Sequence, residues 1–202
     1  MSNDQKKRNN NFNFIIITLI FFAGLGIFQF FMFRNLQLNF QVLKGDIKFE
    51  IYEDYTVDFI TNVDIRAENE RDFNTLLEGF QTSDAEKLQH FQEELNKLEE
   101  QIPRDFVVLS YESKVNSNFP IINLHESVKV KGFVFKKDDG NVEFSLPNQF
   151  LSGPNQRVTV EIVYPESWEI ISVDPTPTYI EQNLIGYTYT GTFGYPSIEF
   201  KE

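Results

Sequence analysis

Side chains suited to metal or acid–base chemistry are few and scattered in this sequence. There is no cysteine, and the only histidines are His90 and His125. A zinc site gathers several nitrogen or sulfur ligands at short spacings, and neither histidine has a partner of that kind. The sequence motifs of phosphate-binding loops, dinucleotide sites and serine hydrolases are also missing. The sequence therefore assigns no catalytic, cofactor-binding or metal residue, and it predicts no cofactor.

One acidic run superficially matches a calcium loop. Asp138, Asp139 and Asn141 surround Gly140. The roughly twelve-residue spacing of EF-hand ligands is absent, and so is the bidentate glutamate that closes such a loop. Because Asp-Gly is a common tight-turn sequence, we predict a hairpin turn here and a second turn at Glu53-Asp54.

Two further groups leave some chemistry open. A hydrolase acting on carbohydrate needs two carboxylates whose separation is set by folding, so the sequence does not exclude one. Aromatic side chains also crowd around two glycines near the C-terminus; they are Tyr187, Tyr189, Phe193 and Tyr195, with Gly191 and Gly194. Such a cluster can be a ligand platform or packing on an edge strand, and packing is the default interpretation.

Charge is distributed unevenly along the chain. The total is −12, but residues 1–35 contain four basic side chains and one acidic side chain, a sum of +3. The remaining residues therefore carry −15, from 14 basic and 29 acidic side chains. A domain with this charge repels nucleic acids and anionic lipid headgroups, so we expect no nucleic-acid partner.

Residues 14–33 form an uncharged, apolar stretch of 20 residues. At ~1.5 Å per residue a helix of this length spans ~30 Å, the thickness of the hydrocarbon core of a bilayer. In lipid the backbone must satisfy its own hydrogen bonds, which favours a helix. The stretch is too long for the core of a signal peptide and lacks a small-residue cleavage site after it. We therefore predict a tail over residues 1–13 and a transmembrane helix that contacts the lipid bilayer over residues 14–33.

The charges beside this segment indicate its orientation. Lys6, Lys7 and Arg8 precede it, and Arg34 is the only base equally close after it. The positive-inside rule then predicts a single-pass protein of the cell membrane, with its N-terminus in the cytoplasm and its C-terminal domain outside. Gln29 can reach interfacial water or hydrogen-bond to a partner helix, and the first interpretation is favoured.

Residues 34–202 form the water-soluble domain, and most of it follows the two-residue period of strands. Alternation begins at Ile47 and continues on both sides of the turn at Glu53-Asp54, which predicts a β-hairpin. Further strands are predicted at 106–111, 128–135, 142–146, 158–164, 168–173, 184–190 and 197–200. Short strands at this spacing favour an antiparallel β-sandwich or open barrel.

A helical period interrupts the strands over about residues 70–102. The apolar face of a first, short helix consists of Phe73, Leu76, Leu77 and Phe80. A second helix begins at a capping box formed by Ser83 and Glu86, and its apolar stripe consists of Leu88, Phe91, Leu95, Leu98 and Ile102. The stripe can pack on the domain's own sheet or form a coiled-coil seam with a partner; its short length favours the first. The predicted fold is α+β, mainly β: a transmembrane helix followed by an antiparallel β-sandwich-like domain with an inserted pair of helices.

The stretch from Tyr164 to Gly191, YPESWEIISVDPTPTYIEQNLIGYTYTG, resembles a pattern of prokaryotic extracytoplasmic domains. A turn of proline, acid and aromatic residue enters a strand, Ser-Val-x-Pro leaves it, and an aromatic strand ending in Thr-Gly follows. The layout is similar to an uncharacterised family of single-span, membrane-anchored proteins. This resemblance implies a β-sandwich and an outward orientation, and it implies no site residues.

These observations favour a non-enzymatic, extracytoplasmic domain that binds a protein partner in the membrane or envelope, or supports an assembly there. Two other functions stay open. One is an envelope enzyme, a carbohydrate-active hydrolase whose carboxylates are brought together by folding. The other is the sensory or substrate-binding subunit of a membrane complex, in which Gln29 and the helical stripe would contact partners.

Overall fold

The computed structural model describes residues 38–99, 102, 104–146, 149–151, 157–190 and 192–202. The predicted transmembrane helix at 14–33 and its flanking tail lie outside the described residues. Among the residues that are described, no helix has both the length and the hydropathy needed to cross a membrane.

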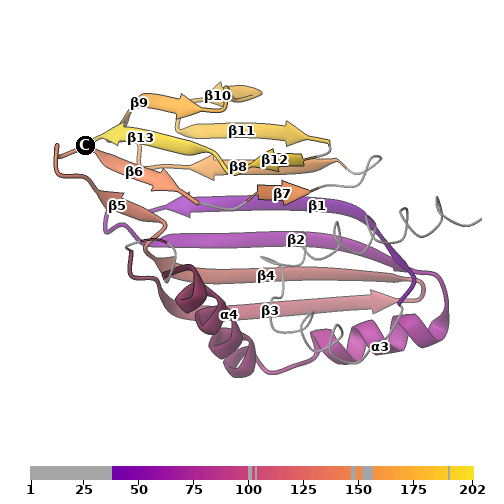
Figure 1. Ribbon diagram of the computed structural model, residues 1–202. Coiled ribbons are helices and arrows are strands. Elements are labelled where there is room, and N and C mark those ends of the chain that lie inside the picture. The colour runs from indigo at the N-terminus through magenta and orange to yellow at the C-terminus, as the bar shows by residue number, and fades with distance from the viewer. Residues whose placement is uncertain (1–37, 100–101, 103, 147–148, 152–156, 191) are drawn as a thin grey trace, which may run out of the picture.

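The largest element of the domain is a sheet of seven strands (Figure 1). In spatial order its strands are β10 (Tyr179–Glu181), β11 (Leu184–Tyr189), β8 (Val158–Val163), β1 (Phe40–Ile51), β2 (Val57–Ala67), β4 (Ile121–Lys131) and β3 (Val107–Asn118). Burial alternates along β2 and β4, so one face of the sheet is apolar and the other is polar. This alternation confirms a mainly β domain and defines an inner face that other elements cover.

One strand pair departs from the predicted antiparallel order. β8 lies beside β1 in parallel, with Ile47 opposite Val160 and Phe49 opposite Ile162, whereas every other described strand pair is antiparallel. The prediction of a purely antiparallel domain is therefore wrong at this pair. The two-residue period fixes which face a strand buries but not the direction of its neighbour, and the long chain between β1 and β8 permits the crossover that a parallel pair needs.

Two helices connect β2 to β3, inside the predicted range of about 70–102. They are α3 (Glu70–Phe80) and α4 (Asp84–Glu99). Asn69 caps α3 by accepting a hydrogen bond from the backbone N–H of Asp72. The apolar stripe of α4 faces the sheet: Phe91 stacks on Phe59 of β2 at 6.4 Å between ring centroids and meets Tyr111 of β3 edge-on. The stripe thus packs on the domain's own sheet.

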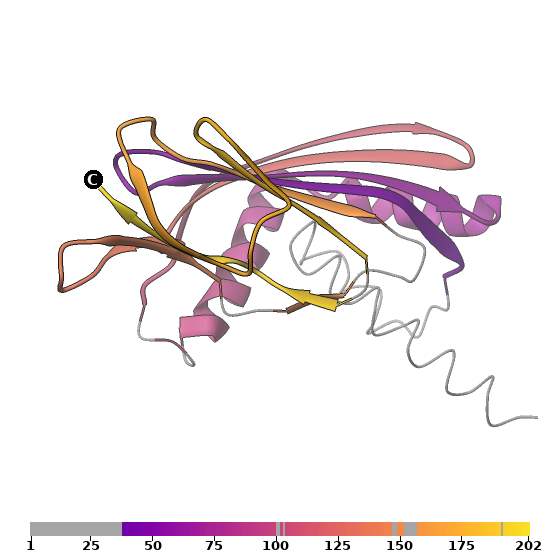
Figure 2. The ribbon, with the colours of Figure 1, turned by 90° about the horizontal axis from the view of Figure 1, so that it is seen from above.

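A four-stranded sheet covers part of the inner face of the large sheet. Its order is β5 (Val134–Lys136), β6 (Val142–Ser145), β13 (Ser197–Lys201) and β9 (Glu169–Asp174), and β7 (Gln149–Leu151) pairs with β12 (Thr192–Gly194) beside it. Figure 2 shows this sheet and α4 on the same side of the large sheet. Phe49 of β1 packs on Phe144 of β6 at 5.1 Å, and Tyr164 packs on Phe200 of β13 at 5.1 Å. Aromatic side chains therefore join the two sheets in one core.

The strand predicted over residues 128–135 is two strands in different sheets. β4 ends at Lys131 in the large sheet, and β5 begins at Val134 in the smaller one. The chain turns at Gly132, where φ is +102° and an added Cβ would lie 2.4 Å from the carbonyl oxygen of Asp105. Only glycine suits both the positive φ and the close backbone approach, so this position lets one apolar run serve two sheets.

The two predicted tight turns are confirmed. β1 and β2 form a hairpin around Glu53-Asp54, in which the carboxylate of Asp54 accepts hydrogen bonds from the backbone N–H and the hydroxyl of Thr56. β5 and β6 are joined at Gly140, where φ is +92° and the backbone N–H of Asn141 donates to Asp139. The Asp139 carboxylate therefore stabilises a turn.

Candidate functional site

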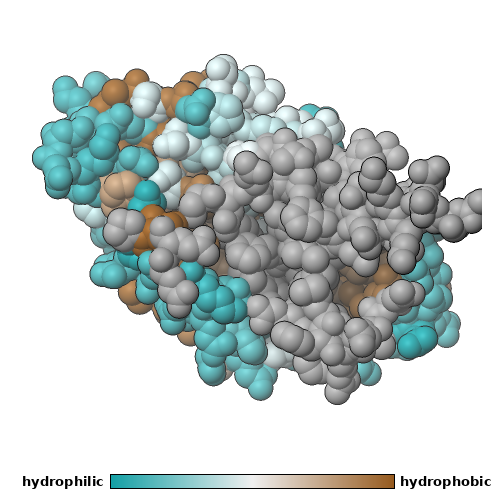
Figure 3. All heavy atoms as spheres, in the orientation of Figure 1, coloured by the Kyte–Doolittle hydropathy of each residue, from teal (hydrophilic) through white to brown (hydrophobic). Residues whose placement is uncertain are grey.

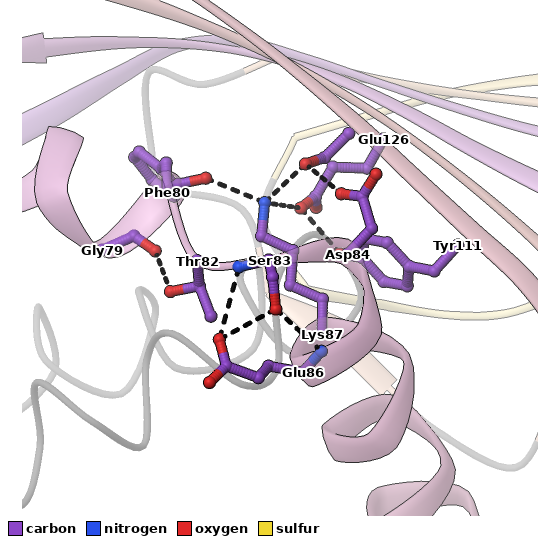
Figure 4. A network of polar contacts seen from close by, with 10 residues as sticks. Gly79, Phe80, Thr82, Ser83, Asp84, Glu86, Lys87, Tyr111 and Glu126 are labelled. Atoms are coloured by element: carbon purple, nitrogen blue, oxygen red, sulfur yellow. Dashed lines mark hydrogen bonds and ion pairs between the residues drawn. The ribbon is translucent and has the colours of Figure 1, made fainter.

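Polar side chains are buried on the inner face where α3 and α4 meet strands β2, β3 and β4 (Figure 4). Lys87 has 2% of its surface exposed and Glu126 has 1%. Charged groups are rarely buried this deeply without partners because they lose their hydration. This group is the candidate site. We call it the Lys87 cluster, and it consists of Thr61, Asp84, Lys87, Tyr111, Ser113 and Glu126.

The start of α4 positions Lys87. The predicted capping box is present: Ser83 Oγ accepts from the backbone N–H of Glu86 at 3.3 Å, and the Glu86 carboxylate accepts from Ser83. The hydroxyl of Thr82 also donates to the carbonyl of Gly79 in the last turn of α3. These bonds fix the corner between the helices, so the first turn of α4 directs Lys87 against the sheet.

The Lys87 ammonium joins three elements. Its Nζ donates to the carbonyl oxygen of Phe80 at the end of α3, at 2.8 Å, and to Ser113 Oγ on β3, at 2.6 Å. It also lies 3.9 Å from Glu126 Oε1 on β4, and Ser113 in turn donates to Asp84 at 3.0 Å. One side chain thus ties both helices to two strands.

Glu126 occupies a core position of β4. The hydroxyl of Tyr111 donates to its Oε1 at 2.7 Å, but its Oε2 has no hydrogen-bond partner among the described residues. The strand register places Glu126 opposite Thr61 of β2, whose hydroxyl also has no partner among those residues. Two residues that face each other across a strand pair thus each bury a polar atom that has no partner among the described residues.

Burial dominates the protonation of this cluster. It raises the pKa of Glu126 to about 8, against the opposing effects of the Tyr111 hydrogen bond and the Lys87 charge, and Asp84 adds to the rise. Burial also lowers the pKa of the Lys87 ammonium, and Glu126 and Asp84 offset part of this shift. Tyr111 has its pKa raised by burial and by Glu126. The low-dielectric setting therefore favours neutral forms.

The arrangement can hold a proton but does not present it to a substrate. Glu126 is closed off from solvent, whereas Asp84 is exposed and reaches the cluster through Ser113. A glycosidase needs two carboxylates on opposite sides of an accessible bond, and Glu126 and Asp84 do not form such a pair. Within the described parts of the chain, no three His, Asp or Glu side chains gather where they could hold a metal ion.

Both histidines lie away from this cluster. His125 is on the polar face of β4, where its Nδ1 lies 2.8 Å from the side-chain oxygen of Asn62. His90 is exposed on α4, with its Nδ1 3.6 Å from the carboxylate of Glu93. Each histidine thus has a neighbour within its own sheet face or helix.

The C-terminal tyrosines contribute to packing. Tyr187 is 1% exposed and stacks on Tyr189 at 5.6 Å, and its hydroxyl donates to the carbonyl of Pro175. Tyr195 is buried and meets Phe49 edge-on at 6.0 Å. Of the other residues in the predicted cluster, Gly191 and the side chain of Phe193 lie outside what the structure describes. The buried rings of Tyr187 and Tyr195 fill the core and do not form an exposed platform.

A second feature lies at the outer edge of the four-stranded sheet. β9 pairs with β13 on one side, and no described residue hydrogen-bonds to its backbone on the other side. Ile171 on this strand is 48% exposed, and a bulge at this point leaves it out of the ladder with β13. Figure 3 shows hydrophobic atoms among hydrophilic ones at the end of the molecule where β9 lies.

Residues 40–201 match the family described as "Domain of unknown function (DUF4897)". The chain belongs to this family. The match runs from the first residue of β1 to the last residue of β13, so it covers the β-rich domain together with both helices. No curated protein matches the sequence. Membership confirms the expectation of an uncharacterised family.

The Lys87 cluster was not predicted from the sequence. Its ion pair joins Lys87 and Glu126, which are 39 positions apart, on a helix and a strand. One signal was available: the inward positions of β4 read Ile122, Leu124, Glu126, Val128 and Val130. A single acid within four apolar residues of one face indicates a buried charge that needs a partner.

Proposed function

We propose that this chain is a membrane-tethered, extracytoplasmic domain that binds another protein. The apolar stretch 14–33 supports the tether, and the basic residues before it support an outside location of the domain. What supports binding is the open edge of β9 with its exposed apolar side chain. Monomeric proteins guard such edges because unpaired backbone groups recruit other strands.

The Lys87 cluster supports a structural role beside this binding role. Its charged groups contact the domain's own elements, and Glu126 is 1% exposed. Because the cluster attaches α3 and α4 to the sheet, it keeps the scaffold rigid. A rigid scaffold presents a binding edge at a lower entropic cost than a mobile one.

Site-specific photo-crosslinking in native membranes tests the proposal. A photo-reactive amino acid replaces Ile171 on β9 in one variant and Leu109 on β3 in a matched variant, since the two side chains are 48% and 46% exposed. We expect one adduct of defined mass from position 171 and none from position 109. Recovery of the chain without any adduct from position 171 would refute the binding function.

The tether is tested separately by fractionation. Ile20→Arg places a charge in the middle of the predicted span and should cost ~2.5–3.5 kcal/mol of insertion. The variant should leave the membrane fraction, whereas Ile20→Leu should stay there. An unchanged membrane fraction for the arginine variant would argue against the span.

A further inference from the structure

The outer edge of β9 is less protected than the other edges of the two larger sheets, although a bulge at Ile171 interrupts it. At the start of β3, at one end of the large sheet, Gln92 of α4 binds the backbone groups of Phe106 and Val108, and the exposed residues from Ser110 onward are polar or charged, although Val107 and Leu109 are exposed as well. β10 and β5, at the other edges, have three residues each. Cover, charge and short length are three ways in which proteins prevent edge pairing. β9 has six residues, no lysine and no covering element among those described.

The side chains of β9 fit a partner strand. Ile170 and Val173 pack partly into the core, while Ile171 points to solvent. An added strand would extend the apolar inner layer beside Ile170 and Val173, and it would cover Ile171. Main-chain hydrogen bonds to such an edge supply affinity, and pockets for alternate side chains supply specificity.

Acidic residues lie on β9, just before it, and on β10, the next strand in the chain. Glu169 and Asp174 stand at the two ends of β9, Glu166 precedes it, and Glu181 lies on β10. All four side chains are exposed, and none of them forms an ion pair with another described residue. In the ladder with β13, Glu169 lies opposite Lys201 and Asp174 lies opposite Ser197. Acids at both ends of a strand favour basic residues at the corresponding ends of a partner.

The same charges disfavour pairing with a second copy of this chain. A two-fold antiparallel contact between two β9 strands brings Glu169 of one copy beside Asp174 of the other, twice. Like charges directly opposed across a strand pair are destabilising. The occupant is therefore a different chain.

We propose that β9 receives an extended segment of another protein as a fifth strand of the smaller sheet. That segment carries Lys or Arg near both ends and β-branched or aromatic side chains between them. The inference rests on the proposed binding function and specifies its mode, namely strand addition, and the chemistry of the partner.

Labelled peptides test this mode with the full chain in detergent micelles. The probes are capped hexapeptides Lys-X-Thr-X-Thr-Lys, in which X is Val, Ile or Tyr, and binding is measured by fluorescence anisotropy. At least one of them should bind, and its Glu-flanked counterpart should bind about tenfold more weakly because two attractive end pairs become repulsive. Two N-methylated versions of the peptide test the main-chain bonds. In one, the amides along one edge of the extended peptide are methylated, and in the other, the amides along the opposite edge. Only the version whose methylated amides face β9 should lose binding.

Protein variants locate the site. Ile171→Lys places a lysine on the edge, as guarded edges do, and should weaken binding by about tenfold or more. Ile180→Lys is the matched control, because Ile180 is 49% exposed and lies on β10. It should change binding by less than about threefold. Amide hydrogen exchange should slow in β9 and stay unchanged in β3 when peptide is added.

The outcomes separate this inference from the proposed function. Absence of binding by every Lys-flanked peptide, undiminished binding by both N-methylated versions, or equal losses in the two lysine variants would overturn strand addition at β9. A crosslinked adduct at position 171 with the mass of a second copy would likewise overturn the inference. In the first three cases an adduct of a different protein at position 171 would still support the binding function.

Discussion

The start of the β3 edge is covered by side chains of α4, whereas the edge of β9 is open among the described residues. At the start of β3, the side chain of Gln92 on α4 donates to the carbonyl of Phe106 and accepts from the backbone N–H of Val108, at 2.8 and 2.7 Å. Glu99 accepts from the N–H of Phe106 at 2.6 Å. α4 thus satisfies backbone groups that a neighbouring strand would otherwise take. β9 has no such cover among the described residues.

The Lys87 cluster and the side chains that cover the start of β3 act together, because both hold α4 against the sheet. Lys87 anchors the first turn of α4 through Phe80 and Ser113, and Gln92 and Glu99 act further along the same helix. If α4 leaves the sheet, the edge of β3 opens as well. The domain therefore uses a buried charge to keep one edge closed, and it leaves the edge of β9 available.

The largest expected effect comes from breaking the anchor. Lys87→Met leaves the Phe80 carbonyl without its donor and Glu126 without its nearby positive charge, so unfolding free energy should fall by about 3–5 kcal/mol. Urea denaturation of the full chain in detergent micelles measures this loss. Lys97→Met on the same helix is the control, because the Lys97–Glu94 ion pair involves an exposed lysine and should contribute about 0–1 kcal/mol.

A double variant checks the physical reason for that loss. Lys87→Met combined with Glu126→Leu removes both charges and should recover most of the stability, because apolar residues can replace a buried ion pair. An equally unstable double variant would show that Lys87 acts through its bonds to Phe80 and Ser113 and not through Glu126.

A second, pH-dependent effect comes from Glu126. Its pKa is about 8 in the folded domain, against an ordinary value of 4.5, which applies to the unfolded chain. Between these values the folded state holds a proton that the unfolded state has lost, so this group makes stability fall as pH rises from 4.5 to 8. Burial lowers the pKa of Lys87, so this group adds a slope of the opposite sign at pH values below its ordinary pKa of 10.5.

Glu126→Gln isolates this contribution. The amide keeps an oxygen for the Tyr111 hydroxyl and cannot ionise. The variant should match the wild type in urea midpoint near pH 5 and exceed it near pH 8. A difference that does not change with pH would contradict the raised pKa. The matched control is Glu112→Gln on the exposed face of β3, which should not alter the pH profile.

How much of this was predictable depends on whether contacts are local. The capping box at Ser83 and the turn at Gly140 were predicted because the interacting residues are within a few positions of each other. The stripe with Phe91 was predicted because its period is that of a helix. These features required no knowledge of the rest of the fold.

Features that depend on distant partners were missed. The second half of β3, from Glu112 to Asn118, was not predicted as a strand. Its sequence is almost entirely polar and so lacks an apolar two-residue period, because an edge strand has little to bury. The parallel partner of β1 and the Lys87–Glu126 pair join residues far apart in sequence. Their positions are fixed by tertiary packing, which the two-residue and 3.6-residue periods do not encode.

A third effect tests the cover on β3 directly. Gln92→Ala removes one donor and one acceptor from edge backbone groups, and it should cost about 1–3 kcal/mol of unfolding free energy. Exchange of the Val108 amide should become faster. Gln89→Ala removes an exposed bond to Glu93 one turn earlier and should have little effect on either quantity. Equal effects of the two variants would mean that α4 does not guard this edge.

The smallest stability effect should come from the open edge itself. Ile171→Lys should change unfolding free energy by less than about 0.5 kcal/mol, because the side chain is 48% exposed and stands outside the ladder with β13. The neighbouring change, Ile170→Lys, should cost about 1–3 kcal/mol, since Ile170 pairs with Phe200 and packs against the core. A stability loss at position 171 as large as that at 170 would mean that Ile171 serves the fold of the isolated chain. An unchanged stability at 171, together with lost peptide binding, would leave a partner as the reason for an isoleucine at this position.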